Sequence, residues 1–141
     1  MSLKTFIRDN QNKKASIEAL AWSGIYRFLL CFVPMKTIRP LFGKEGEETA
    51  KEHGNGDYDS ARRIAYVVNR ICSNTPWESK CLVRALTAQH LLRKKRMPST
   101  LYLGVAKEND NMIAHAWIRY GDFYLTGGLG EGYTVVSKFR A

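Results

Sequence analysis

The chain has 141 residues, of which 45% are apolar and 25% charged. This length suits one domain that buries a core without disulfides, and the composition excludes disordered, collagen-like and disulfide-scaffold proteins. The net charge of 22 − 13 = +9 indicates an anionic partner, such as nucleic acid, an anionic membrane or an acidic peptide, or else only a solubilising surface. We expect one domain over 1–141, with a helical lead-in at 1–43 and the core at 57–141.

The N-terminal part predicts one long helix. Residues 1–14 are polar and contain no apolar h-region, so they predict no signal peptide. Residues 15–33 predict a helix with a broad apolar face that stops at Pro34. Charged residues interrupt its apolar runs, so no transmembrane segment is expected. A basic link at 35–44 and a polar surface loop at 44–57 follow.

Two further helices are predicted in the middle of the chain. Residues 57–71 carry apolar side chains at the 3.6-residue period. Thr75 to Glu78 match a capping box with proline at the first helical position, and Ser79 is an alternative N-cap. The third helix then runs to Arg96 and ends at Met97-Pro98. Its expected buried stripe is Leu82, Ala85, Leu86 and Leu92.

After Pro98 the hydrophobic period changes from 3.6 to 2 residues, which predicts strands. Turns are expected at 107–111 and 121–122, and a glycine-rich loop at 127–132. The expected strands are 101–106, 112–120, 123–126 and 133–139. Helices followed by an antiparallel meander indicate an α+β fold. Because the glycine loop precedes a strand and not a helix, no nucleotide site is expected there.

Three cysteines without CxxC spacing argue against a zinc site and against a disulfide framework. We therefore expect no metal, no other cofactor and a reducing cytoplasm. Cys31 and Cys72 lie in apolar helical runs and are expected to be small buried hydrophobes. Cys81 lies in the first turns of a helix, close to Lys80 and Arg84, and this position favours the nucleophilic thiolate.

A nucleophilic cysteine needs a base, and the sequence offers three histidines. His90 follows Cys81 by nine residues on the same helix, about 900° of rotation, and so points to the opposite face. His53 lies in the polar loop and is expected to be solvated. His115 lies mid-strand between two alanines, which leave room for another element to pack on the imidazole. His115 is the candidate base, with a structural role as the alternative.

The segment TPWESKCLVRALTAQHLLRKKRMPSTLYLGVAKENDNMIAHAWIRYG resembles the core of the transglutaminase-like cysteine peptidases of lasso-peptide biosynthesis. It carries Trp77 four residues before Cys81, a Leu-Gly-Val strand at 103–105 and the Ala-His-Ala-Trp motif at 114–117. The resemblance implies an α+β, papain/transglutaminase-like fold in which the cysteine helix packs on an antiparallel sheet. It implies a hydrolase that removes the leader from a ribosomally made precursor, with Cys81 as nucleophile and His115 as base.

One departure from the family pattern concerns the third catalytic group. The family usually has an aspartate about a dozen residues after the histidine, and this chain has Gly127 there. A two-residue turn at Gly121-Asp122 would place residue 115 opposite 128, with Asp122 about 23 Å away along the strand. The third group is left open between Thr126, a backbone carbonyl, Glu131 and none.

The sequence also suggests how the substrate is bound and which partner proteins are needed. Backbone N–H groups at the helix start could form an oxyanion hole, and Trp77 either walls the substrate site or packs over the helix start. No segment is left for a peptide-recognition domain. We therefore expect a separate leader-binding protein and a lasso cyclase as partners, docked through the positive charge and the helix at 17–33.

Three alternatives remain. A transglutaminase or arylamine-type acyltransferase would share the chemistry as far as the thioester and differ only in the acceptor. A basic module that binds nucleic acid would leave Cys81 and His115 structural; we expect no nucleic-acid partner. A protein of the membrane surface would use 17–33 as an in-plane helix.

Overall fold

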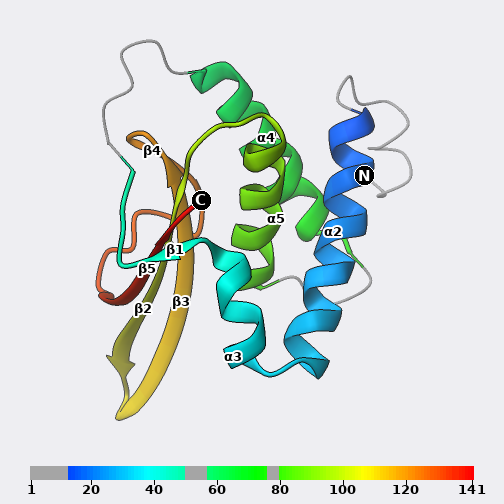
Figure 1. The fold of residues 1–141 in the computed structure, drawn as a ribbon. Coiled ribbons are helices and arrows are strands. Elements are labelled where there is room, and N and C mark those ends of the chain that lie inside the picture. The colour runs from blue at the N-terminus through cyan, green and yellow to red at the C-terminus, as the bar shows by residue number, and fades with distance from the viewer. Residues whose placement is uncertain (1–12, 50–56, 76–79) are drawn as a thin grey trace.

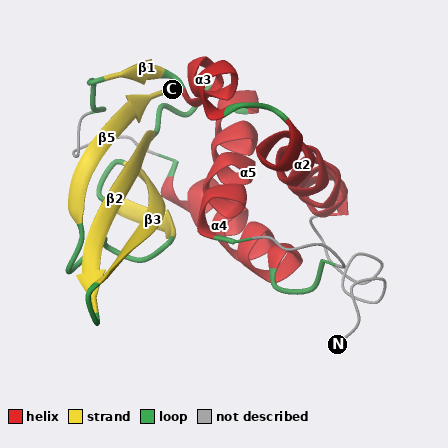
Figure 2. Cartoon of the chain, turned by 90° about the horizontal axis from the view of Figure 1, so that it is seen from below, coloured by secondary structure: helices red, strands yellow, loops and turns green. Residues whose placement is uncertain are grey.

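The computed structural model describes residues 13–49, 57–75 and 80–141. In this part of the chain a layer of helices covers one face of a five-stranded antiparallel sheet (Figure 1). The long helices are α2 (Lys13–Phe32), α4 (Tyr58–Cys72) and α5 (Cys81–Lys94). α5 and α4 contact the sheet, and α2 packs on the far side of these two helices (Figure 2). The predicted α+β class is confirmed.

The helices α2 and α4 agree closely with the periodicity of the sequence. Asp57 caps α4, because its carboxylate accepts hydrogen bonds from the Ser60 N–H at 3.1 Å and from the Ser60 hydroxyl at 2.6 Å. All four apolar residues that define the period of α4 are buried: Ile64, Val67, Val68 and Ile71. The spacing of apolar side chains was therefore enough to predict which face of α4 enters the core.

The start of α5 differs from the prediction. The helix begins at Cys81, and the N-cap residue, Lys80, makes no side-chain capping bond. The hydroxyl of Thr75 donates to the Cys72 carbonyl at 3.4 Å, at the end of α4. The other capping-box residues and Ser79 lie outside the described residues. Cys81 is thus the first helical residue of α5.

The predicted basic link is helical and partly buried, neither of which the sequence analysis anticipated. It forms α3 (Met35–Ile38) and the 3₁₀-helix η1 (Arg39–Phe42). Ile38 and Phe42 enter the core, and the Phe42 ring meets Phe139 edge to face at 5.3 Å. The side-chain amide of Gln89 donates to the Phe42 carbonyl at 2.6 Å. Two apolar anchors and a buried hydrogen bond therefore fold this segment against the domain.

The predicted polar loop contains a short strand, β1 (Lys44–Glu45), which pairs with the last strand. Residues 50–56 of the loop lie outside the described residues. The other strands are β2 (Thr100–Glu108), β3 (Asn111–Tyr120), β4 (Phe123–Thr126) and β5 (Thr134–Arg140). The turn between β2 and β3 is shorter than predicted, because Asn109 and Asp110 both have positive φ and make a two-residue hairpin.

The strand order is β1-β5-β2-β3-β4, so the expected simple meander is wrong. β5 does not pair with β4 but crosses the sheet and pairs with β2. This crossing places Phe139 opposite Leu101, and both side chains are buried. The position of β5 follows from burial of Phe139, a long-range effect that the period-2 pattern of a single strand does not contain.

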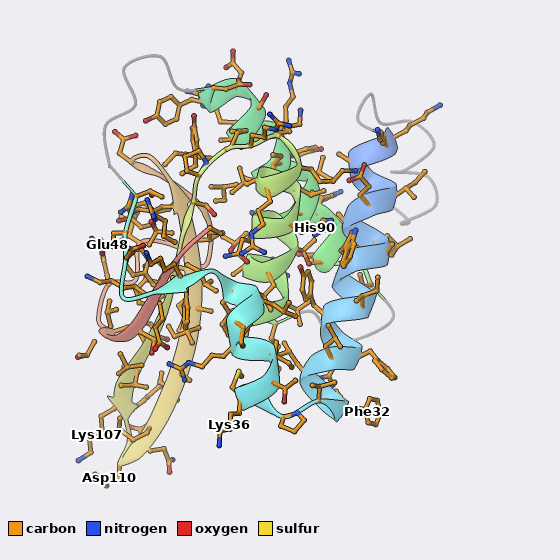
Figure 3. All side chains as sticks on the ribbon, viewed as in Figure 1. Phe32, Lys36, Glu48, His90, Lys107 and Asp110 are labelled. Carbon is orange, nitrogen blue, oxygen red and sulfur yellow. The ribbon has the colours of Figure 1, made fainter. Side chains whose placement is uncertain are left out.

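The helix α2 is apolar on more than one side. Its inner face packs on α4 and α5, whereas Phe28 and Phe32 are 60% and 73% exposed, and Cys31 is exposed as well. The expectation that Cys31 is buried is therefore wrong, while Cys72 is buried as predicted. By length and composition alone α2 could cross a membrane, although a core helix passes the same test. Figure 3 shows Phe32 at the end of α2, where the chain turns towards Lys36.

Candidate active site

Cys81 occupies the first position of α5 and is half-buried against the core. The first N–H groups of a helix have no partner within the helix, and the α5 ladder begins with the Arg84 N–H bonded to the Lys80 carbonyl at 3.0 Å. Arg84 also donates to the Ser73 hydroxyl at 2.9 Å. The first turn of α5 is thereby tied to the end of α4, and the thiol lies beside a row of backbone N–H groups.

His115 lies on β3 at a part of the strand that β4 does not pair. β4 pairs with β3 only over residues 118–120, and beside His115 this edge of β3 is bordered by the loop that follows β4. The imidazole is half-buried, and its Nε2 lies 2.7 Å from the Gly127 carbonyl oxygen. The ring stacks on Tyr133 at 4.9 Å and on Trp117 at 5.9 Å between centroids. A polar contact and two aromatic neighbours therefore define the position of the ring.

Alternation along β3 decides which face His115 occupies. Ala116, Ile118 and Tyr120 belong to the core shared with the helices, so His115 and Trp117 point to the other face. Cys81 packs against the helical side of that core. α5 contacts β3 directly, yet no hydrogen bond joins the Cys81 Sγ to His115 within the described residues. The described structure therefore does not bring Cys81 and His115 together, and the dyad stays a prediction from residue type and motif.

The candidates for a third group can now be compared. Asp122 lies in the exposed turn between β3 and β4, as predicted, and Tyr120 pairs with Phe123. The predicted register also holds for Arg119 and Tyr124 but fails beyond them, because a bulge at Leu125 pairs Ile118 with Thr126. The bulged Leu125 carbonyl accepts from the Asn69 side chain of α4 at 2.9 Å. This hydrogen bond to the helical layer accounts for the shift, which no local pattern in the sequence indicates.

Of the remaining candidates, only a backbone carbonyl contacts His115. Thr126 pairs with Ile118 and so points to the helical face, where its hydroxyl is buried without a hydrogen-bond partner among the described residues. Glu131 is exposed, and the structure describes no hydrogen bond between it and His115. The Gly127 carbonyl stands where the family pattern has an acid. Tyr133 was missed, and the signal was an aromatic residue directly after the glycine loop.

The other candidate residues lie elsewhere. His90 faces α2, as its helical position predicts, and its ring lies 3.8 Å from that of Trp22 (Figure 3). Burial, and next the charge of Lys94, lower the pKa of His90 below its usual 6.5. His53 and Trp77 lie outside the described residues. No group of three or more potential metal ligands occurs within 13–49, 57–75 and 80–141.

Comparison with known proteins gives one result. The family model for the transglutaminase-like superfamily matches residues 29–138, more than three quarters of the chain. No curated protein and no solved structure matches. The matched region contains the helix that begins at Cys81 and the strand that carries His115. The chain therefore belongs to the transglutaminase-like superfamily, whose members include cysteine peptidases and acyltransferases.

Proposed function

We propose that the protein is a cysteine peptidase in which Cys81 is the nucleophile and His115 the base. The observation that carries this proposal is the position of Cys81, the first residue of a helix packed on the histidine-bearing sheet of a transglutaminase-like domain. A helix N-terminus favours the thiolate and offers N–H donors to an oxyanion. The catalytic domain spans 1–141 in this proposal, with 57–141 as its core.

The reaction proceeds in two halves. His115 takes the Cys81 proton, and the thiolate attacks the scissile carbonyl; the C–N bond breaks as His115 protonates the leaving amine, which leaves a thioester. Water then attacks the thioester, His115 takes its proton, and the C–S bond breaks to give the acid and the free thiol. The first half consumes only the peptide, and the second half consumes one water molecule.

The proposed substrate is the leader-bearing precursor of a lasso peptide. This finer assignment is supported by the motifs around Trp77, Cys81 and His115 that resemble lasso-peptide leader peptidases. A net charge of +9 suits an acidic leader or an acidic recognition protein. We place the reaction in the reducing cytoplasm, because cysteines that form no disulfide within the described residues suit that compartment.

Partner proteins are part of the same proposal. We propose that a separate leader-binding protein, and a lasso cyclase next in the pathway, dock on the outer face of α2. Ile17, Ile25, Phe28 and Phe32 are exposed there at helical spacing. An apolar helix whose second face is uncovered suits a protein partner, and tethering the leader nearby raises the effective concentration of the scissile bond.

The decisive test is cleavage of a lasso-type precursor peptide, followed by mass spectrometry with and without a leader-binding protein. We expect cleavage by the wild-type chain and none by Cys81→Ala. Cys31→Ala, assayed without the leader-binding protein, is the matched control, because Cys31 is exposed on α2 and its replacement is expected to leave the rate of the chain alone unchanged. Equal rates for Cys81→Ala and Cys31→Ala would overturn the proposal. Equal cleavage without the partner would overturn only the partner requirement.

Proximity of the two catalytic groups is tested separately by oxidising His115→Cys. A disulfide forms only when the Cα atoms lie within about 7 Å. Because alternation places residue 115 on the sheet face away from Cys81, a dyad requires this part of β3 to turn towards α5. We therefore expect the cross-link between Cys81 and the new cysteine only when substrate is bound. Absence of the cross-link with and without peptide would show that Cys81 and His115 do not form a dyad.

Acyl transfer to an amine is the second candidate, because the superfamily includes acyltransferases and the route to the thioester is the same. Incubation with a peptide and a fluorescent primary amine distinguishes the two. We expect hydrolysed ends and no amine adduct. Predominance of the adduct would identify an acyltransferase.

A further inference from the structure

The glycine-rich loop at 127–132 touches the candidate base at two points. Its first residue places a carbonyl oxygen 2.7 Å from the His115 Nε2. The residue directly after it, Tyr133, stacks on the imidazole with ring centroids 4.9 Å apart and ring planes 29° apart. These contacts come from a segment that follows β4 and precedes β5, so both depend on the path of one loop.

The chemistry of the carbonyl contact determines where the proton sits on the ring. A carbonyl oxygen has lone pairs and no proton, so it can only accept a hydrogen bond. The Nε2 atom must therefore carry the hydrogen in neutral His115, and Nδ1 keeps the lone pair. A neutral histidine with a fixed tautomer presents one defined basic atom.

The loop reaches this position only because two of its glycines lie directly on Trp117. A Cβ added at Gly127, where φ is +79°, would collide with the Ala116 carbonyl and lie 2.8 Å from the Trp117 Cβ. A Cβ at Gly130 would collide with the indole ring. Any side chain at these positions would lift the loop from Trp117 and move the carbonyl away from His115.

The other two glycines of the loop behave differently. Gly128 and Gly132 also have positive φ, of +73° and +83°, but a Cβ at either position meets no atom within 4 Å. They serve only the backbone turn. The close approach is therefore confined to the two glycines that hold the loop against Trp117, which is 3% exposed.

We infer that the Gly127 carbonyl and the Tyr133 ring form a neutral clamp that positions His115, with the proton on Nε2 and Nδ1 as the basic atom. The clamp replaces the acid that the family resemblance led us to expect at position 127. An aspartate side chain has no space at Gly127, so the backbone supplies the acceptor instead. Gly127 and Tyr133 act through His115 and are positioning residues; the catalytic consequence rests on the proposed function, whereas the tautomer does not.

The clamp is tested by NMR of the imidazole nitrogens in the ¹⁵N-labelled protein at a pH where His115 is neutral. The His115 signals are assigned by their loss in His115→Gln. We expect the Nε2–H tautomer in the wild type, a mixture of tautomers in Gly127→Ala, and the wild-type pattern in Gly128→Ala. The last two variants carry similar backbone strain, so they differ mainly in the collision with Ala116 and Trp117.

A second pair of variants, at Tyr133, tests the clamp even if Gly127→Ala does not fold. Tyr133→Leu removes the stacked ring, and Tyr133→Phe keeps it. We expect Tyr133→Leu to broaden or shift the His115 signals and to lower kcat at least about tenfold, with KM within about twofold, because a misplaced base affects the chemical step. Tyr133→Phe is expected to retain the wild-type spectrum and rate.

The outcomes separate the clamp from the proposed function. An Nδ1–H tautomer in the wild type, or identical spectra for Gly127→Ala and Gly128→Ala, would overturn the clamp even if Cys81 and His115 prove essential. The expected spectra with no cleavage of any peptide would support the clamp and overturn the peptidase assignment.

Discussion

Two histidines of this protein lie against aromatic rings, and their surroundings differ. His90 lies in the helical layer, 3.8 Å from Trp22 and next to Tyr26, where α5 meets α2. His115 lies on β3, stacked on Trp117 and Tyr133 and bonded to the Gly127 carbonyl.

Aromatic contact is common to both histidines and so identifies neither as catalytic. The two histidines differ in the segments that border the ring, and a ring nitrogen of His115 contacts a backbone carbonyl. His115 is bordered by the loop that follows β4, whereas the half-buried His90 ring lies between α5 and α2. We therefore expect the two histidines to separate activity from stability.

The largest expected effect is on catalysis at His115. Replacement of a positioned acid–base group lowers the rate by about 10²–10⁴-fold, so His115→Ala is expected to lower single-turnover cleavage by at least that range. His90→Ala is the matched comparison and is expected to keep the rate within about threefold. Equal losses for the two variants in single-turnover cleavage would show that His115 has no catalytic role that His90 lacks.

The reverse ranking is expected for stability. His90→Ala removes the ring between α5 and α2 and is expected to lower the free energy of unfolding by about 1–3 kcal/mol, as for other losses of buried packing. His115→Ala, at a half-buried edge position, is expected to cost less. Urea denaturation followed by circular dichroism measures both, and a smaller loss for His90→Ala would contradict this ranking.

The pH dependence of stability sharpens the same comparison. Burial lowers the pKa of His90 in the folded state below 6.5, so the unfolded chain binds the proton more readily. The contribution of neutral His90 to the free energy of unfolding is complete above pH 6.5. It is lost as the pH falls from there towards the folded-state pKa. We expect the melting temperature to decrease from pH 7.5 to pH 5.5 by more in the wild type than in His90→Leu. Parallel curves for the two proteins would show that His90 is not responsible.

The smallest expected effect is at Asp122. This residue lies at the tip of the β3–β4 turn, on the same strand connection as His115 but away from its ring. Asp122→Asn is expected to change the cleavage rate by less than about twofold. A loss comparable to that of His115→Ala would mean that Asp122 reaches the imidazole during the reaction and that the Gly127 carbonyl is not the functional partner.

Local patterns in the sequence were sufficient for the long helices and the four long strands, but not for α3, η1 and β1. The 3.6-residue period of 57–71, the interruption at Pro34 and the alternation after Pro98 predicted α4, the end of α2 and the strands, because each pattern depends only on neighbours along the chain. Helices preceding an antiparallel sheet also established the α+β class. The turn at Gly121-Asp122 followed from the local preferences of these residue types.

Only the tertiary structure decided the strand order, the bulge at Leu125 and the contact between Gly127 and His115. The bulge depends on Asn69 of another element, and the position of β5 depends on burial of Phe139 beside Leu101. The contact to His115 is made by a backbone carbonyl, which every residue has and which no sequence motif marks. Cys81 and His115 could be selected by residue type and position, but the partner of the imidazole could not, because packing of the loop on Trp117 sets it.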